Sequence, residues 1–235
     1  LGLDENTVVI FTSDNGGVSS GDAFATSCLP LRGGKGRQWE GGIRQPYYIR
    51  VPKLTKPGST NATPVTGTDF YPTILELAGL SLRPNQHVDG VSLLPLLKGG
   101  TIANRDLFWH YPHYGNQGGE PSSIIRSGNL KLIHYYEDGH DELYNLAKDI
   151  GEQTDLAQSQ PQVTKTLRMK LNKWLEETKA RIPVADSRFH AARKKKQLQD
   201  SRTVTLERLE RRHANYLSPT FTPNANWWSS LVPKD

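Results

Sequence analysis

Cysteine is almost absent from the sequence, with Cys28 as its single example. One cysteine excludes an internal disulfide. Long apolar runs are also missing, so the sequence predicts no membrane-spanning helix, and no segment is typical of a signal peptide. The phosphate-binding pattern GxxxxGK[ST] does not occur either. The sequence has 235 residues, of which 35% are hydrophobic. This length and composition suffice for one α/β domain or most of two small ones.

Charge is unevenly distributed along the chain. Residues 1–180 hold 18 Lys/Arg against 19 Asp/Glu, whereas residues 181–235 hold 11 against 5. The net charge of +5 therefore belongs to the tail. The basic clusters at 193–196 and 211–212 could contact an anionic polysaccharide, a nucleic acid or a membrane surface. Because Glu207 and Glu210 are interleaved, a solvated tail, helical or extended, is favoured, and no nucleic-acid partner is expected.

An unbroken apolar run at residues 8–11 ends at Asp14, Asn15, Gly16 and Gly17. Such a run before a glycine turn predicts a strand buried on both faces of a parallel sheet. Ligands of open α/β sheets gather beyond the carboxyl ends of the strands, which makes Asp14 and Asn15 candidates for a site. A carboxylate beside a carboxamide offers hard oxygen ligands suited to Ca²⁺ or Mg²⁺. The alternative is a plain turn, which the two glycines also favour.

A second glycine-rich segment follows at residues 31–37, with Lys35 between Gly34 and Gly36. Glycine lets a backbone come close to a ligand, and the Lys35 ammonium is a mobile point charge for an oxyanion. By itself this loop is weak grounds for anion binding.

The segments TSDNGG, PLRGGKG and WEGGIR, in this order and spacing, resemble the second half of the arylsulfatase-like type I sulfatases of the alkaline phosphatase superfamily. The resemblance continues through TDFYPTILELAG, VDGVSLLPLL and ELYNL, and covers about residues 1–180. It implies an α/β fold: the C-terminal part of a mixed or parallel sheet domain, followed by a small antiparallel sheet-and-helix subdomain. Residues 1–104 would belong to the former, residues 105–180 to the latter, and residues 181–235 would form the basic tail.

The resemblance also implies roles for individual residues. Asp14 and Asn15 would be two of the four side-chain ligands of a catalytic Ca²⁺, with Mg²⁺ less favoured, and Lys35 would be catalytic through its contact with the sulfate ester. The formylglycine nucleophile of the family, made from a C-x-P-S-R segment, would lie in an N-terminal part that this chain lacks.

Cys28 sits in a loose C-x-P-x-R pattern with Pro30 and Arg32. It lies after the Asp-Asn pair, however, and leads into Gly33 and Gly34 instead of a helix that could activate a nucleophile. We therefore do not expect formylglycine at Cys28.

Short apolar runs after residue 105 predict strands joined by tight turns, and helical spacing from Pro161 predicts a helix over residues 161–180. His110 and His113 precede the glycine-rich stretch at 115–119. Pro112 between them argues against a zinc pair on a helix. In similar sulfatases this region approaches the mouth of the site, so either histidine could contact the sugar or aryl part of a substrate; packed or surface histidines are the alternative.

The resemblance predicts a sulfuric ester hydrolase that acts on a carbohydrate or aryl sulfate, in the periplasm or outside the cell. A phosphatase or phosphonate hydrolase of the same superfamily is the first alternative. A non-catalytic binding remnant is the second, since Asp14, Asn15 and Lys35 have no nucleophile beside them in this sequence. We expect the chain alone to hydrolyse nothing.

Overall fold

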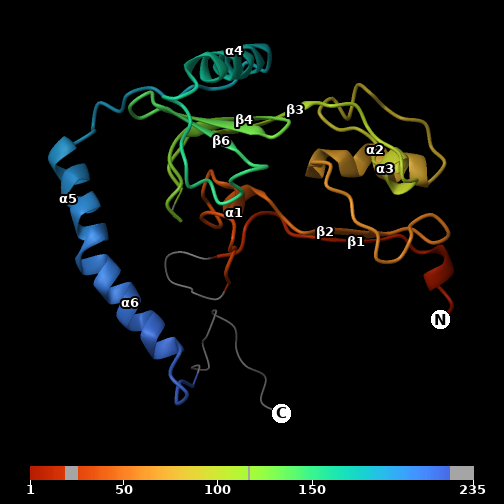
Figure 1. Cartoon of the computed structure of the whole chain (residues 1–235), viewed down its shortest axis with the longest axis horizontal. Helices are drawn as coiled ribbons and strands as arrows, with labels where there is room; N and C mark the ends of the chain where they lie inside the picture. Colours follow the sequence, from red (N-terminus) through yellow and green to blue (C-terminus); the bar gives the residue numbers. More distant parts are fainter. Residues whose placement is uncertain (19–25, 116, 223–235) are drawn as a thin grey trace.

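A four-stranded antiparallel sheet lies at the centre of the molecule (Figure 1). The computed structural model describes residues 1–18, 26–115 and 117–222. The strands follow one another in sequence order, and a two-residue turn at Gly128 and Asn129 joins the middle pair. These strands confirm the predicted antiparallel sheet; they are β3 (Asp106–Tyr111), β4 (Ser122–Ser127), β5 (Leu130–Tyr135) and β6 (Asp141–Asn145).

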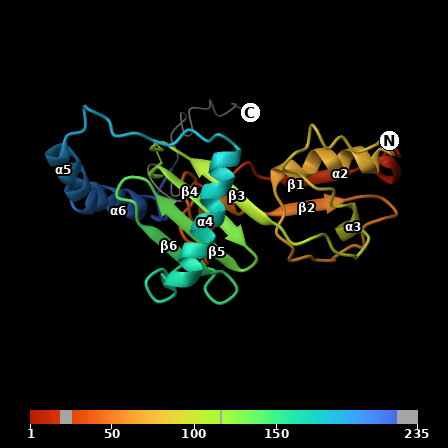
Figure 2. The same ribbon diagram turned by 90° about the horizontal axis from the view of Figure 1, so that it is seen from above.

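Helix α4 (Pro161–Glu177) crosses one face of this sheet (Figure 2). Its buried residues Leu167, Leu171 and Leu175 are four apart, so they lie on one side of the helix. They pack against sheet residues that include Leu132, which is fully buried. Burying each such leucine contributes about 1.5–3 kcal/mol to folding. The predicted helix thus begins where expected and ends three residues earlier.

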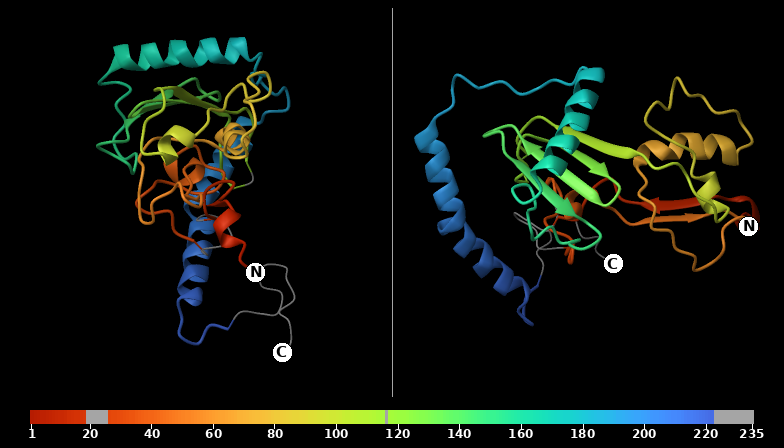
Figure 3. Two further views of the ribbon diagram at one scale, coloured as in Figure 1. Left: turned by 90° about the vertical axis from the view of Figure 1, so that its right-hand side faces the viewer. Right: turned by 45° about the horizontal axis from the view of Figure 1, so that its top comes forward.

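The opposite face of the sheet packs against the short helix α1 (Glu40–Ile43) and the residue before it. Ile133 and Tyr144 are buried there, and Trp39 and Ile43 pack against their cluster. With α4 above and α1 below, the sheet forms a middle layer (Figure 3). This packing holds the Lys35 segment against the sheet.

Strand β1 (Val9–Thr12) differs from the prediction. It pairs with β2 (Tyr47–Arg50) in an antiparallel ribbon, and no parallel neighbour exists among the described residues. Val9 and Phe11 are 50% and 66% exposed, so the expected burial on both faces was wrong for this chain. The physical reason is that the ribbon is covered on one face only: Tyr47 stacks on Phe70 there, whereas the face that carries Val9 and Phe11 has no second layer among the described residues.

Two short helices, α2 (Phe70–Leu77) and α3 (Leu94–Leu97), lie beside the ribbon. The fully buried Asp69 accepts hydrogen bonds from the backbone amides of Thr66 at 2.8 Å and Val91 at 2.9 Å. It also pairs with Arg105, which directly precedes β3. A single carboxylate therefore caps the helical segment and ties it to the sheet.

The basic tail forms helices α5 (Ala191–Arg202) and α6 (Val204–Tyr216), which lead away from the sheet (Figure 3). Neither helix contains a buried residue. The first is fastened by Lys194, whose Nζ lies 3.2 Å from Glu137 and over the ring of Tyr114. Trp227 and Trp228, which could stack on a sugar, lie outside the described residues. No helix in the described ranges is both long and apolar enough to cross a membrane.

Candidate active site

Backbone hydrogen bonds join the two glycine-rich segments that the sequence singled out. The Gly16 amide donates to the Gly42 carbonyl, and the Lys35 amide donates to the Gly17 carbonyl, both at 2.9 Å. The Asp14–Asn15 turn and the loop carrying Lys35 are therefore neighbours, although seventeen residues lie between Gly17 and Lys35 in the sequence. The backbone thus brings the two candidate segments side by side.

This contact requires glycine. A Cβ at Gly16 would overlap the Gly41 carbonyl oxygen, and a Cβ at Gly42 would overlap the Arg37 carbonyl oxygen. Since backbone atoms cannot move aside as a flexible side chain can, the glycines let three chain segments approach one another closely.

Replacing Gly42 by alanine is expected to destabilise the chain by about 1–3 kcal/mol, because the added methyl group must displace backbone. Urea denaturation would measure the loss. Gly67→Ala is a matched control, since a Cβ there meets open space and the residue has no left-handed φ. Equal stability of the two variants would show that the close packing at Gly42 is not needed.

Asp14 and Asn15 offer a partial set of ligands for a hard cation. Asp14 is exposed and Asn15 half-buried, and the Asn15 amide nitrogen donates to Asp14 Oδ2 at 2.6 Å. The described residues contain no cluster of three or more His, Cys, Asp or Glu side chains that could hold a metal. One carboxylate and one carboxamide fit Ca²⁺ chemically, but supply few of the six to eight oxygens it takes.

The loop around Lys35 is held by the segment that follows His113. Arg37 donates through Nη1 to the Gly118 carbonyl, and Gln38 donates through Nε2 to the Glu120 carbonyl at 2.8 Å. Lys35 itself is half-buried between these anchors and the turn at Gly17. The stretch of chain after the two histidines thus packs directly beside Lys35.

The two histidines have different surroundings. His110 Nε2 donates to the Arg181 carbonyl at 3.0 Å, and its Nδ1 lies 2.7 Å from the Ser123 hydroxyl. Both ring nitrogens of His110 are therefore engaged within the protein. His113 is exposed, and its ring lies 3.9 Å from that of Tyr111.

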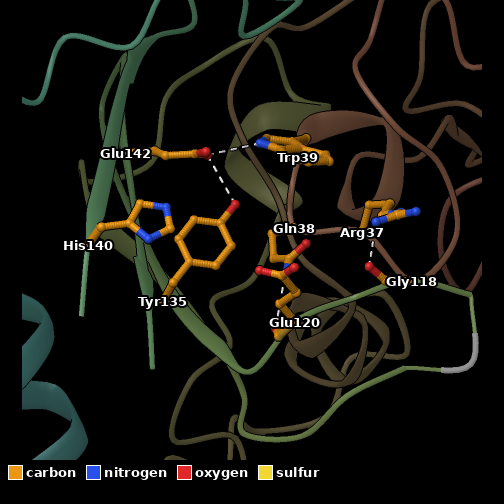
Figure 4. A pocket seen from close by; sticks show the side chains of 8 residues that line it. All are labelled: Arg37, Gln38, Trp39, Gly118, Glu120, Tyr135, His140 and Glu142. Atoms are coloured by element: carbon orange, nitrogen blue, oxygen red, sulfur yellow. Dashed lines mark hydrogen bonds between the residues drawn. The ribbon is translucent and has the colours of Figure 1, made fainter. Parts of the chain in front are cut away.

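A cavity of about 220 Å³ opens between the Lys35 loop and the sheet (Figure 4). Glu142 Oε2 accepts hydrogen bonds there from Trp39 Nε1 at 3.1 Å and from the Tyr135 hydroxyl at 3.0 Å. Burial and the Glu142 carboxylate raise the pKa of Tyr135 well above its usual value, so its hydroxyl stays a donor. The ring of His140 stacks on Tyr135 with centroids 4.4 Å apart. The lining combines aromatic surface with polar groups.

Sequence reasoning missed a buried ion cluster beneath this loop. Lys131 Nζ lies 3.1 Å from Glu40 Oε1 and 2.8 Å from Glu152 Oε1, and all three side chains are at most 2% exposed. Arg126 approaches Glu40 at 3.6 Å. Burial raises the pKa of Glu152, while Lys131 acts in the opposite direction. The strand that carries Lys131 reads LKLIHY and gave no signal of this cluster.

Comparison with known proteins places the chain in a family. The family model for N-sulphoglucosamine sulphohydrolase, C-terminal, matches residues 35–181. A sulfatase from Formosa agariphila is 41% identical over 183 residues, which cover 73% of this chain and 32% of that protein. Human arylsulfatase A is 33% identical over 194 residues, covering 72% of this chain and 38% of its own length. The chain thus spans about a third of the length of these curated relatives.

Solved structures share the fold. Ps i-CgsB in complex with k-i-k-neocarrahexaose has a TM-score of 0.61 and 30% identity, over 72% of this chain and 36% of its own. A protein solved with its substrate, D-glucosamine-2-N,6-O-disulfate, has a TM-score of 0.56 and 27% identity, over 74% and 34%. These likenesses confirm the predicted α/β fold class. Family model, relatives and structures agree that the chain belongs to the sulfatase family and corresponds to the C-terminal half of its fold.

Proposed function

We propose that the chain is the C-terminal part of a sulfuric ester hydrolase of the formylglycine and calcium type. The observation that carries the proposal is the backbone contact between the Asp14–Asn15 turn and the Lys35 loop. This contact supports the proposal because an ester anion whose charge grows in the transition state needs both a cation and a donor, and the two neighbouring segments carry the candidate residues for each. Membership of the sulfatase family supports the same chemistry.

Within this proposal, Asp14 and Asn15 would hold Ca²⁺ in preference to Mg²⁺. The bound cation would neutralise negative charge on the sulfate oxygens. Lys35 would act as a catalytic residue by donating a charge-assisted hydrogen bond to a sulfate oxygen. The formylglycine would come from outside this sequence, since the half-buried Cys28 directs its Sγ to the Gly17 carbonyl at 3.7 Å.

The substrate class we favour is a carbohydrate sulfate, with an aryl sulfate as the second choice. Similar structures hold a neocarrahexaose and a disulfated glucosamine. We assign contact with the non-sulfated part of the substrate to His113 before His110, because both nitrogens of His110 are engaged. We further propose action in the periplasm or outside the cell, where large glycans are accessible.

A phosphatase or phosphonate hydrolase would also stabilise its ester anion with a cation and a hydrogen-bond donor. The test is the relative turnover of 4-nitrophenyl sulfate and 4-nitrophenyl phosphate by the full-length gene product. Faster hydrolysis of the sulfate supports the proposal. Faster hydrolysis of the phosphate would replace it with the alternative.

The chain of 235 residues is expected to release no sulfate by itself, even with Ca²⁺ added. Asp14, Asn15 and Lys35 would polarise a sulfate, but the formylglycine that would attack it comes from outside this sequence in the proposed mechanism. Ion chromatography of sulfate after prolonged incubation with a sulfated oligosaccharide would measure this. Release above that of a Lys35→Ala chain would contradict the expectation. If the full-length product is also inactive but binds the oligosaccharide, the function is binding.

A further inference from the structure

One residue fastens both ends of the segment that carries Lys35. At the start of the segment, Arg32 donates through Nη1 to the main-chain carbonyl of Glu152 at 2.9 Å. At its end, the backbone amide of Glu40 donates to Glu152 Oε2 at 2.6 Å. Glu152 lies more than a hundred residues further along the chain, as the separations of 120 and 112 show.

Glu152 occupies its place at an energetic cost. Its φ is +50°, in the left-handed region that disfavours residues with a Cβ. Lys53 and Lys179 share this feature, but both are exposed, whereas Glu152 is fully buried. A strained backbone and a buried carboxylate together persist only where the surrounding structure compensates for them. Lys131 compensates for the buried carboxylate, because its Nζ lies 2.8 Å from Glu152 Oε1.

The fastened segment cannot hold its own shape. Gly33 and Gly36 have φ values of +74° and +82°, and Gly34 lies between them. Glycine loses more backbone freedom on ordering than any other residue, so this loop depends on contacts at its ends. The ring of Trp39 adds one such contact by stacking under the Arg32 guanidinium at 3.8 Å.

We propose that Glu152 is a positioning residue that closes the 32–40 segment from both ends and thereby sets the place of Lys35. The carbonyl and the carboxylate of one buried residue act as a clip, and Lys131 makes burial of that carboxylate tolerable. That Lys35 meets a sulfate oxygen rests on the proposed function. The clip itself does not, because it concerns only how the loop is held.

Amide hydrogen exchange of the chain, read by NMR, tests the clip. Three amides within or beside the segment report on it, namely those of Lys35, Arg37 and Gly41, which donate to Gly17, Gly34 and Arg32. In Glu152→Ala these amides are expected to exchange about tenfold faster or more, the equivalent of one lost hydrogen bond to a charged group. Glu152→Gln keeps an acceptor for the Glu40 amide and is expected to restore slow exchange at Gly41.

Asp155→Ala provides the matched control. Asp155 belongs to the same loop, but the amides that it accepts, at 2.9 Å each, are those of Leu143 and Ala157 and lie outside the 32–40 segment. This variant is expected to leave the three reporter amides slow. Exchange within α4 would show in each variant whether the sheet and its helix stay folded.

Arg32→Met keeps the experiment decisive if Glu152→Ala unfolds, because it removes the first fastening and leaves the buried carboxylate in place. Faster exchange at Lys35 and Arg37, with α4 unchanged, supports the clip. Unchanged exchange at both amides in Arg32→Met, or the same acceleration throughout α4 in every variant, overturns it.

In the full-length product the clip predicts a loss in kcat larger than the change in KM for Arg32→Met. A full-length product that is inactive towards sulfate esters would refute the proposed function alone.

Discussion

Lys131→Met is expected to lower the free energy of unfolding by about 3–5 kcal/mol, because breaking a buried ion pair leaves charge uncompensated. Methionine fills much of the space but offers nothing to Glu40 and Glu152, which now lie at 3.1 and 2.8 Å from the ammonium. Small proteins have a total stability of about 5–15 kcal/mol. The substitution would therefore remove a large share, and urea denaturation at neutral pH would measure it.

The control is Lys170→Met. Lys170 pairs with Asp106 at 2.9 Å, but its side chain is 47% exposed. Solvent screens such a pair, so its loss is expected to cost less than about 1 kcal/mol. Similar losses in the two variants would show that the buried cluster contributes no more than a surface pair.

Acid should relieve the Lys131→Met defect. Burial raises the pKa of Glu152 even in the native chain. A carboxyl group whose folded-state pKa lies above its unfolded value destabilises the protein as pH rises through the folded value, since the unfolded state then holds fewer protons. The difference between Lys131→Met and the native chain is therefore expected to shrink as the pH falls below neutrality. A difference that stays constant with pH would contradict a charge-based origin.

Lys35→Ala in the full-length gene product is expected to reduce kcat for a sulfate ester by about 10²–10³, the range seen when one preorganised donor to a developing anion is removed. Stability should change little, because Lys35 is tied to Gly17 through its backbone amide and not its side chain. Steady-state kinetics with 4-nitrophenyl sulfate would measure the effect.

Lys98→Ala serves as the comparison for Lys35→Ala, since Lys98 is exposed just after α3 and away from the loop. It should leave kcat within experimental error. A Lys35→Ala enzyme with native kcat would remove Lys35 from the reaction. A fall confined to KM would reassign it to substrate binding.

Local features of the fold could be predicted from the sequence. Short apolar runs and tight turns mark β3 to β6, and leucines four apart mark α4. The prediction for strand β1 was wrong because an apolar run indicates that a strand should be buried, but does not say which other element would cover it. In the described residues Val9 and Phe11 face solvent on a two-stranded ribbon.

The support of the Lys35 loop lay beyond sequence reasoning. Lysine in a strand ordinarily predicts a solvent-facing position, whereas Lys131 points to Glu40, 91 residues earlier in the chain. Glu152 likewise gave no local sign of holding Arg32 and Glu40. Long-range pairing of buried charges depends on the assembled sheet, which a single sequence does not display.

The exposed β1–β2 ribbon also bears on how the chain behaves in solution. Its strands leave backbone donors and acceptors unpaired along their outer edges within the described residues, beside the exposed rings of Phe11 and Tyr48. Flat apolar strands with open edges recruit further strands from other molecules. Self-association and poor solubility of the isolated chain would thus originate at this ribbon, and a charged residue in place of Phe11 is the simplest way to suppress them.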